Sequence, residues 1–153
     1  MKNDTRHRAR QRLDERLLPL KPIERYKQPP KGWLRAIRDA LGMTGVQFAR
    51  RLGVSPQSVD ALEKSEATGS IKLDTLRRAA EALDCTLVYA LVPNTSLEGV
   101  VTDRARAIAL HDLGRVAHTM KLEAQGTGDA DMERRIESYI RDTLKDRDLW
   151  ARS

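Results

Sequence analysis

Apolar residues recur at three- and four-residue steps along much of the chain, and glycine or polar breaks separate the runs. Such spacing places the apolar residues on one face of a helix. Four runs lie between residues 33 and 83, with these expected inner residues: Trp33, Ile37 and Leu41; Phe48, Ala49 and Leu52; Val59 and Leu62; Leu73, Leu76, Ala79, Ala80 and Leu83.

Three local signals set the boundaries of the middle helices. Thr44 is followed three residues later by Gln47, which is the pattern of a capping box. Gly53 ends that helix, and Ser55-Pro56 is typical of an N-cap followed by the first helical position of the next one.

The remaining segments have different patterns. An Arg-rich helix is expected over 5–18, and the prolines between Pro19 and Pro30 predict an extended linker. Residues 86–92 (TLVYALV) predict a short strand or an extended packing segment before Pro93. Residues 96–151 predict two amphipathic helices, separated at Gly126-Thr127-Gly128.

These elements predict an all-α protein in three parts. Residues 1–32 would form a basic N-terminal arm and Pro-rich linker, and residues 33–93 a domain of four to five short helices with a short extended segment. Residues 94–153 would form a C-terminal region of two helices. That region either mediates dimerisation, binds a partner or packs back on the domain.

Composition narrows the class of protein. The 153 residues are 40% hydrophobic and 4% aromatic, with a single cysteine, so no internal disulfide is possible. Cys85 is expected to be buried packing in a reducing compartment. No apolar run approaches the length of a membrane span, and we expect a cytoplasmic, nucleoid-associated protein.

The excess positive charge is concentrated near the N-terminus. The formal net charge is +6. Residues 1–31 hold ten Lys/Arg and four Asp/Glu, residues 32–93 eight and seven, and residues 94–153 ten and eleven. A basic segment attached to a domain indicates a polyanion partner such as nucleic acid, or else a solvated tail.

The segment Gly45–Lys64 (GVQFARRLGVSPQSVDALEK) meets the demands of two short helices joined by a tight turn. Ala49 is small enough for the helices to touch, and Gly53 can take the positive φ that the turn needs. Val59 and Leu62 supply apolar residues that hold the second helix on the first. The combination predicts a helix-turn-helix that binds duplex DNA.

The run from Trp33 to Leu83 resembles the Cro/phage-repressor-type helix-turn-helix domain, also called the XRE family. The whole chain is similar to the family named mobile mystery protein A. The residues that carry this second likeness are RLDER at 12–16, GWLRAIRDALG at 32–42 and LVYALVP at 87–93. It implies a gene neighbour that encodes a Fic-domain protein.

The XRE resemblance assigns base contacts to the start of the second helix. Pro56, Gln57 and Ala61 fall at base-contacting positions, and Ser58 reaches base or phosphate. Gln57 is the strongest candidate because an amide pairs bidentately with adenine. Ala61 offers a methyl contact to thymine, whereas Pro56 has no donor.

Five further residues are expected at phosphates. The resemblance places Arg38 and Lys64 there, with Lys72 as a weaker candidate. Thr44 would bind phosphate together with backbone amides at its helix N-terminus. Ser55 either does the same or only caps its helix, and Arg50 and Arg51 are expected to be solvated or ion-paired.

Because the domain itself is nearly neutral, we expect the arm to contribute to DNA affinity. Its candidates for a minor groove or the phosphate backbone are Arg6, Arg8, Arg10 and Arg12. The alternative is an arm that folds across a partner subunit.

Other chemistry has little support in the sequence. His7, His111 and His118 are not spaced as metal ligands, and no residue pattern indicates catalysis or a cofactor. Two functions remain. One is a repressor that binds a pseudo-palindromic operator as a homodimer. The other is an antitoxin-like protein that holds a neighbouring Fic-domain product and represses their shared promoter.

Overall fold

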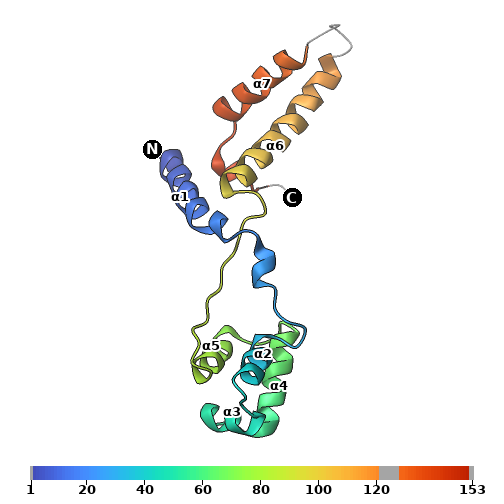
Figure 1. Ribbon diagram of the computed structural model, residues 1–153. Coiled ribbons are helices and arrows are strands. Elements are labelled where there is room, and N and C mark those ends of the chain that lie inside the picture. The colour runs from blue at the N-terminus through green and yellow to red at the C-terminus, as the bar shows by residue number, and fades with distance from the viewer. Residues whose placement is uncertain (1, 121–127, 152–153) are drawn as a thin grey trace. The chain divides into compact units, whose positions relative to one another are not determined.

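The computed structural model describes residues 2–120 and 128–151, and every regular element among them is helical (Figure 1). The predicted all-α class is therefore confirmed. The chain divides into two compact units, one of residues 22–91 and the other of residues 1–21 with 92–153.

The unit of residues 22–91 contains the four helices expected from the apolar pattern. They are α2 (Trp33–Ala40), α3 (Gly45–Leu52), α4 (Pro56–Ala67) and α5 (Leu73–Ala82). Helix α3 packs against α4 and α5, and α2 packs against α4. The core consists of six buried residues: Leu34, Phe48, Ala49, Val59, Ala79 and Leu83.

The predicted inner face of α2 is correct at Ile37, which packs against the core, and wrong at its two ends. Trp33 and Leu41 are 42% and 58% exposed, and the buried residues of this helix are Leu34 and Arg38. The apolar pattern treated Arg38 as an outward residue. In the fold its guanidinium is buried against a carboxylate, on the same side of the helix as the core residue Leu34.

Helix α2 begins at an unusual N-terminus. Gly32 precedes it with φ 86° and supplies no side-chain cap. The carboxylate of Glu66 instead accepts from the backbone N–H of Trp33 at 2.8 Å and of Leu34 at 3.1 Å. A Cβ at Gly32 would stand 2.2 Å from Glu66 Oε2, so this close approach requires glycine.

The other unit contains α1 (Lys2–Leu17), α6 (Leu97–Met120) and α7 (Asp129–Asp142). Helix α6 packs against both α1 and α7. The buried apolar residues of this unit are Ala105 and Ala109 on α6, Ile136 on α7, and Leu149 near the C-terminal end. The helix expected over 5–18 is confirmed as α1. The predicted break at Gly126-Thr127-Gly128 falls largely outside the described residues.

Two expectations about the irregular segments are refined. The proline-rich stretch is not continuously extended, because 3₁₀ turns form at Leu18–Leu20 and Ile23–Tyr26. Residues 86–91, which follow α5, form neither a helix nor a strand among the described residues (Figure 1).

Candidate nucleic-acid interface

Helices α3 and α4 are joined by a three-residue turn, Gly53-Val54-Ser55. Gly53 adopts a left-handed conformation with φ 70° and ψ 32°. Its N–H and that of Val54 donate to carbonyl groups in the last turn of α3, with Val54 N to Ala49 O at 3.0 Å. The turn therefore ends α3 with satisfied carbonyls and redirects the chain into α4.

Side-chain hydroxyls cap both helices. Thr44 Oγ1 accepts from Gln47 N at 3.1 Å, and Gln47 Oε1 accepts from Thr44 N at 2.9 Å, which confirms the capping box. Ser55 Oγ accepts from Ser58 N at 3.2 Å and lies 2.8 Å from Ser58 Oγ. Thr44 and Ser55 thus cap their helices, and both are exposed. They stand at helix N-termini, where a phosphate would meet backbone N–H groups.

Helix α4 has one buried and one exposed face. Val59 is 2% exposed and Leu62 packs against the same core. The opposite face is open, and all four residues expected to reach bases are exposed: Pro56, Gln57, Ser58 and Ala61. The structure therefore brings these four together on the first two turns of one helix.

Asp60 shares this exposed face and was not among the residues singled out from the sequence. Its carboxylate lies 2.9 Å from Lys64 Nζ, and a hydrogen bond from Lys64 lowers the pKa of Asp60 below its usual range. The i, i+4 spacing to Pro56 and Lys64 could have indicated this position. A carboxylate among the residues expected to contact bases adds an acceptor to the face and offsets the charge of Lys64.

Arg38 differs most from its expected role at a phosphate. Its side chain is 10% exposed and donates to Glu63, from Nε at 2.5 Å and from Nη2 at 3.1 Å. Nη1 also donates to Met43 O at 2.9 Å. The hydrogen bond to Glu63 raises the pKa of Arg38, although burial opposes this. A phosphate contact would require breaking this pair, so Arg38 is a structural link between α2 and α4.

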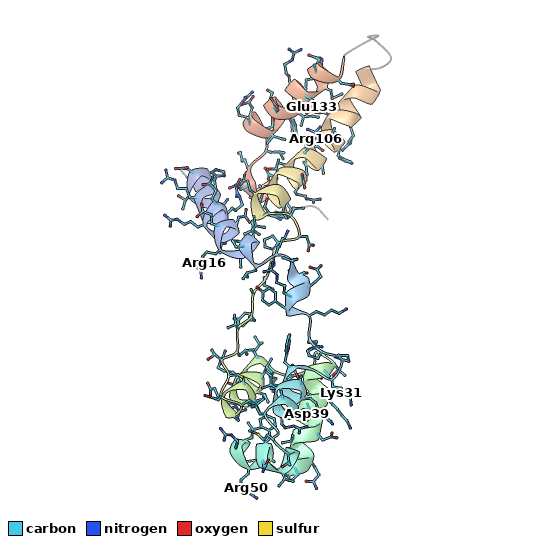
Figure 2. All side chains as sticks on the ribbon, viewed as in Figure 1. Arg16, Lys31, Asp39, Arg50, Arg106 and Glu133 are labelled. Carbon is cyan, nitrogen blue, oxygen red and sulfur yellow. The ribbon has the colours of Figure 1, made fainter. Side chains whose placement is uncertain are left out.

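The other basic residues expected near α4 are on the surface. Lys64 and Lys72 are exposed, and Lys72 is the residue that precedes α5. Arg50 projects from α3 into solvent (Figure 2), whereas Arg51 Nε donates to Ala82 O at 2.7 Å and ties α3 to the end of α5.

Residues 34–89, a little over a third of the chain, match a family model described as "Helix-turn-helix". They form an XRE-type helix-turn-helix domain. Neither a curated protein nor a solved structure matches the chain. Because such domains bind DNA, the chain carries a DNA-binding regulatory domain, and the capped N-terminus and open face of α4 are its candidate interface.

Outside the helix-turn-helix domain, the four arginines of the expected basic arm lie on α1. Arg6 pairs with Asp146 at 2.7 Å, Arg10 with Glu98 at 2.6 Å, and Arg8 with Asp4 at 2.9 Å within α1. Arg12 is exposed. The segment is thus a helix packed against α6, on which Arg6, Arg8 and Arg12 are exposed and Arg10 is largely covered.

Helix α1 also caps α6. Asp14 is 9% exposed, and its carboxylate accepts from Leu97 N at 2.7 Å and from Glu98 N at 3.2 Å. A carboxylate at a helix N-terminus is favoured by both the free N–H groups and the helix dipole. Asp14 therefore fixes the end of α1 to the start of α6.

The part of the chain that the structure describes offers neither a metal-binding cluster nor a membrane-spanning helix. No group of three or more His, Cys, Asp or Glu residues there could hold a metal ion. His118, one of the three histidines considered above, has its side chain outside that part. No helix there is long and apolar enough to cross a membrane.

Proposed function

We propose that this protein is a sequence-specific transcriptional regulator, a repressor that binds a pseudo-palindromic operator as a homodimer. The observation that carries the proposal is the open face of α4, where Gln57, Asp60 and Ala61 stand together in an XRE-type helix-turn-helix domain. In this class of domain the second helix enters the major groove and its first residues contact base edges.

Each exposed residue of α4 suits a different contact. Gln57 can pair bidentately with N6 and N7 of adenine, and the Ala61 methyl can meet a thymine methyl. Asp60 can accept from N4 of cytosine once it exchanges its bond from Lys64. Pro56 and Ser58 complete the surface but offer less discrimination.

Contacts to the DNA backbone would come from around this face. Thr44 and Ser55 stand at the N-termini of α3 and α4, where backbone N–H groups favour phosphate. Lys64 and Lys72 add two exposed cations. The solvent-facing cations of α1, Arg8 and Arg12, would extend the contacts. The phosphate contacts position the domain, and α4 reads the sequence.

Two copies are needed for high specificity. A single module buries little surface on DNA and contacts few base pairs, whereas a dimer on a pseudo-palindrome doubles both. We therefore propose that the DNA-binding form of the repressor is a homodimer. Its operator would contain two half-sites one helical turn apart.

A second candidate function rests on the unit formed by α1, α6 and α7. It exposes several large apolar side chains suited to a protein partner: Leu13, Val100, Leu110 and Trp150. Together with the resemblance to mobile mystery protein A, this supports an antitoxin-like role in which the unit binds a Fic-domain product. Co-purification of that neighbouring product with this protein is the discriminating result.

The test of DNA reading is selection from a random duplex pool, with wild-type protein and Gln57→Ala in parallel. We expect an adenine-containing half-site for the wild type. Gln57→Ala should lose that preference at one base pair, by about 1–3 kcal/mol, and retain the others. Gln57 is exposed, so the variant should fold normally.

Gln11→Ala is the matched control, because Gln11 is an exposed glutamine on α1 outside the helix-turn-helix domain. It should select the wild-type site. A Gln57→Ala protein with an unchanged preference at every position would refute base reading by α4. A wild-type protein that enriches no sequence would refute the proposed function.

A further inference from the structure

The segment that follows α5, residues 86–91, exposes an unusual amount of apolar surface. Its sequence is TLVYAL, in which Val88, Tyr89 and Leu91 are 83%, 68% and 83% exposed. β-Branched and aromatic residues of this kind favour strands. A cluster of exposed large apolar side chains is characteristic of an interaction surface.

The backbone of this segment is unpaired. The last backbone hydrogen bond before it is Cys85 N to Ala80 O at 2.9 Å, and no N–H or C=O group of the described residues 86–91 bonds to another protein group. A strand-forming segment with free donors and acceptors is a template for pairing with another strand.

The residues are complementary to themselves when one copy is reversed. About a two-fold axis at Tyr89, Leu87 faces Leu91, Val88 faces Ala90, and Tyr89 faces its own copy. The segment carries no charged residue, so no like charges meet across the axis. Cross-strand pairs of aromatic and aliphatic residues stabilise such ribbons.

The start of the segment is anchored to its own domain. Leu87 and Val88 form one wall of an apolar groove of about 310 Å³, together with Trp33, Ile37 and Leu76. The carboxylate at this groove, Glu66, is occupied by the N–H groups of Trp33 and Leu34. Leu87 is half-buried there, whereas Val88 stands at the rim and keeps 83% of its surface exposed, so the open surface runs from Val88 to Leu91.

From these observations we infer that residues 87–91 pair antiparallel with the same residues of a second copy. The two-fold axis passes through Tyr89, and Val88, Tyr89 and Leu91 are covered in the ribbon. The inference rests on the proposed function, since it assigns the interface of the homodimer that reads two half-sites. A second copy is favoured over another partner because the sequence pairs with itself.

The first test compares the oligomeric state of two full-length variants by sedimentation velocity. Val88→Lys places like charges near the two-fold axis and should convert the dimer to a monomer. Leu41→Lys is the matched control, because Leu41 is 58% exposed, lies in the same unit as Val88 and belongs to neither proposed binding surface. It should remain a dimer. A dimeric Val88→Lys protein, or a monomeric Leu41→Lys protein, would overturn the assignment.

The second test fixes the register by oxidation of single cysteines in a Cys85→Ser background. Directly opposed residues have Cβ atoms about 4.5–5.5 Å apart, so Tyr89→Cys should form a disulfide between copies. Leu91→Cys should not, because residue 91 of the second copy is four residues distant, about 13 Å. A mixture of Leu87→Cys and Leu91→Cys proteins should form only the mixed disulfide.

Failure of this inference and failure of the proposed function give different results. A wild-type monomer that still enriches one DNA sequence overturns the ribbon and leaves DNA reading intact. A dimer cross-linked through Tyr89→Cys that enriches no sequence supports the ribbon and refutes the function. If both stand, Val88→Lys should lose the preference for paired half-sites and retain the wild-type sequence within one half-site.

Discussion

The pair Arg38–Glu63 is a buried ion pair in the helix-turn-helix domain. Their side chains are 10% and 5% exposed, and the guanidinium makes two bonds to the carboxylate and a third to Met43 O. Removing one partner of such a pair leaves an uncompensated buried charge, which costs much more than the pair contributes. The two residues therefore act as a unit that joins α2 to α4.

Replacement of either partner should destabilise the domain strongly. We expect Arg38→Ala and Glu63→Ala each to lower the free energy of unfolding by about 3–5 kcal/mol. The apolar double variant Arg38→Met/Glu63→Leu should recover most of that loss. Urea titrations, followed by the indole N–H NMR signal of Trp33, measure the free energy of unfolding of all three variants. If Arg38→Ala instead unfolds like the wild type and only weakens DNA binding, Arg38 acts at a phosphate.

Single residues show what the sequence could and could not predict. The exposure of Gln57 and Ala61 follows from helical spacing within α4, because Val59 and Leu62 take the opposite face. The burial of Arg38 could not be predicted, because its partner lies 25 residues away and local spacing carries no signal of a buried ion pair. The cap of α2 by Glu66 was missed for the same reason.

At the scale of elements, the turn between α3 and α4 depends on one conformation. Gly53 has φ 70°, and no atom lies within 4 Å of the position that a Cβ would take. Any cost of a side chain there comes from the left-handed backbone alone, at about 1–2 kcal/mol. Packing would not contribute.

A pair of glycine substitutions isolates the conformational cost of a side chain at Gly53. Gly53→Ala should lower the free energy of unfolding by about 1–2 kcal/mol. Gly45→Ala should raise it by about 0.5–1 kcal/mol, because Gly45 begins α3 in open space without a positive φ. Thermal unfolding of both variants checks the signs. Equal effects at the two positions would contradict a conformational role for Gly53.

Helix α1 is held on α6 by an ion pair that makes stability depend on pH. The hydrogen bond from Arg10, with a smaller effect of His7, lowers the pKa of Glu98. A carboxyl group with a lowered pKa in the folded state stabilises the fold above its unfolded pKa, about 4.3. That contribution disappears as pH falls through the lower folded value.

We therefore expect Glu98→Gln to make the unit of α1, α6 and α7 less sensitive to acid. Between neutral pH and about pH 4.3 the wild type should be more stable than the variant, and the difference should vanish at lower pH. Urea titrations followed by the Trp150 indole signal provide the measurement. Glu15→Gln, an exposed glutamate on α1, is the control and should keep the wild-type pH profile. A constant difference at all pH values would exclude the ion pair as its source.

The elements themselves were largely predictable, whereas the packing of α1 was not. Capping residues and apolar spacing gave α3 and α4 because those signals are local. The basic segment before the prolines also gave a helix, but its charge suggested a free arm. The structure instead buries Asp14 against the start of α6 and pairs Arg10 with Glu98, contacts that span more than 80 residues.

At the scale of the whole molecule, the chain comprises two units with separate cores. The unit of residues 22–91 buries four large apolar side chains, Leu34, Phe48, Val59 and Leu83. Among the described residues of the other unit, only Ile136 and Leu149 are large and buried, alongside two alanines. Since burial of apolar area is the main stabilising contribution, the second unit should be the less stable one.

The two tryptophans allow this difference to be measured in the intact protein. Trp33 lies in the unit of residues 22–91 and Trp150 in the other, and the chain has no third tryptophan. Their indole N–H signals, assigned with Trp33→Phe and Trp150→Phe, should disappear in separate urea transitions, with Trp150 first. Separate cores unfold separately unless a large interface couples them. Coincident transitions would mean that one cooperative body carries both the DNA-reading helix and the α1–α6–α7 unit, and that DNA binding stabilises both together.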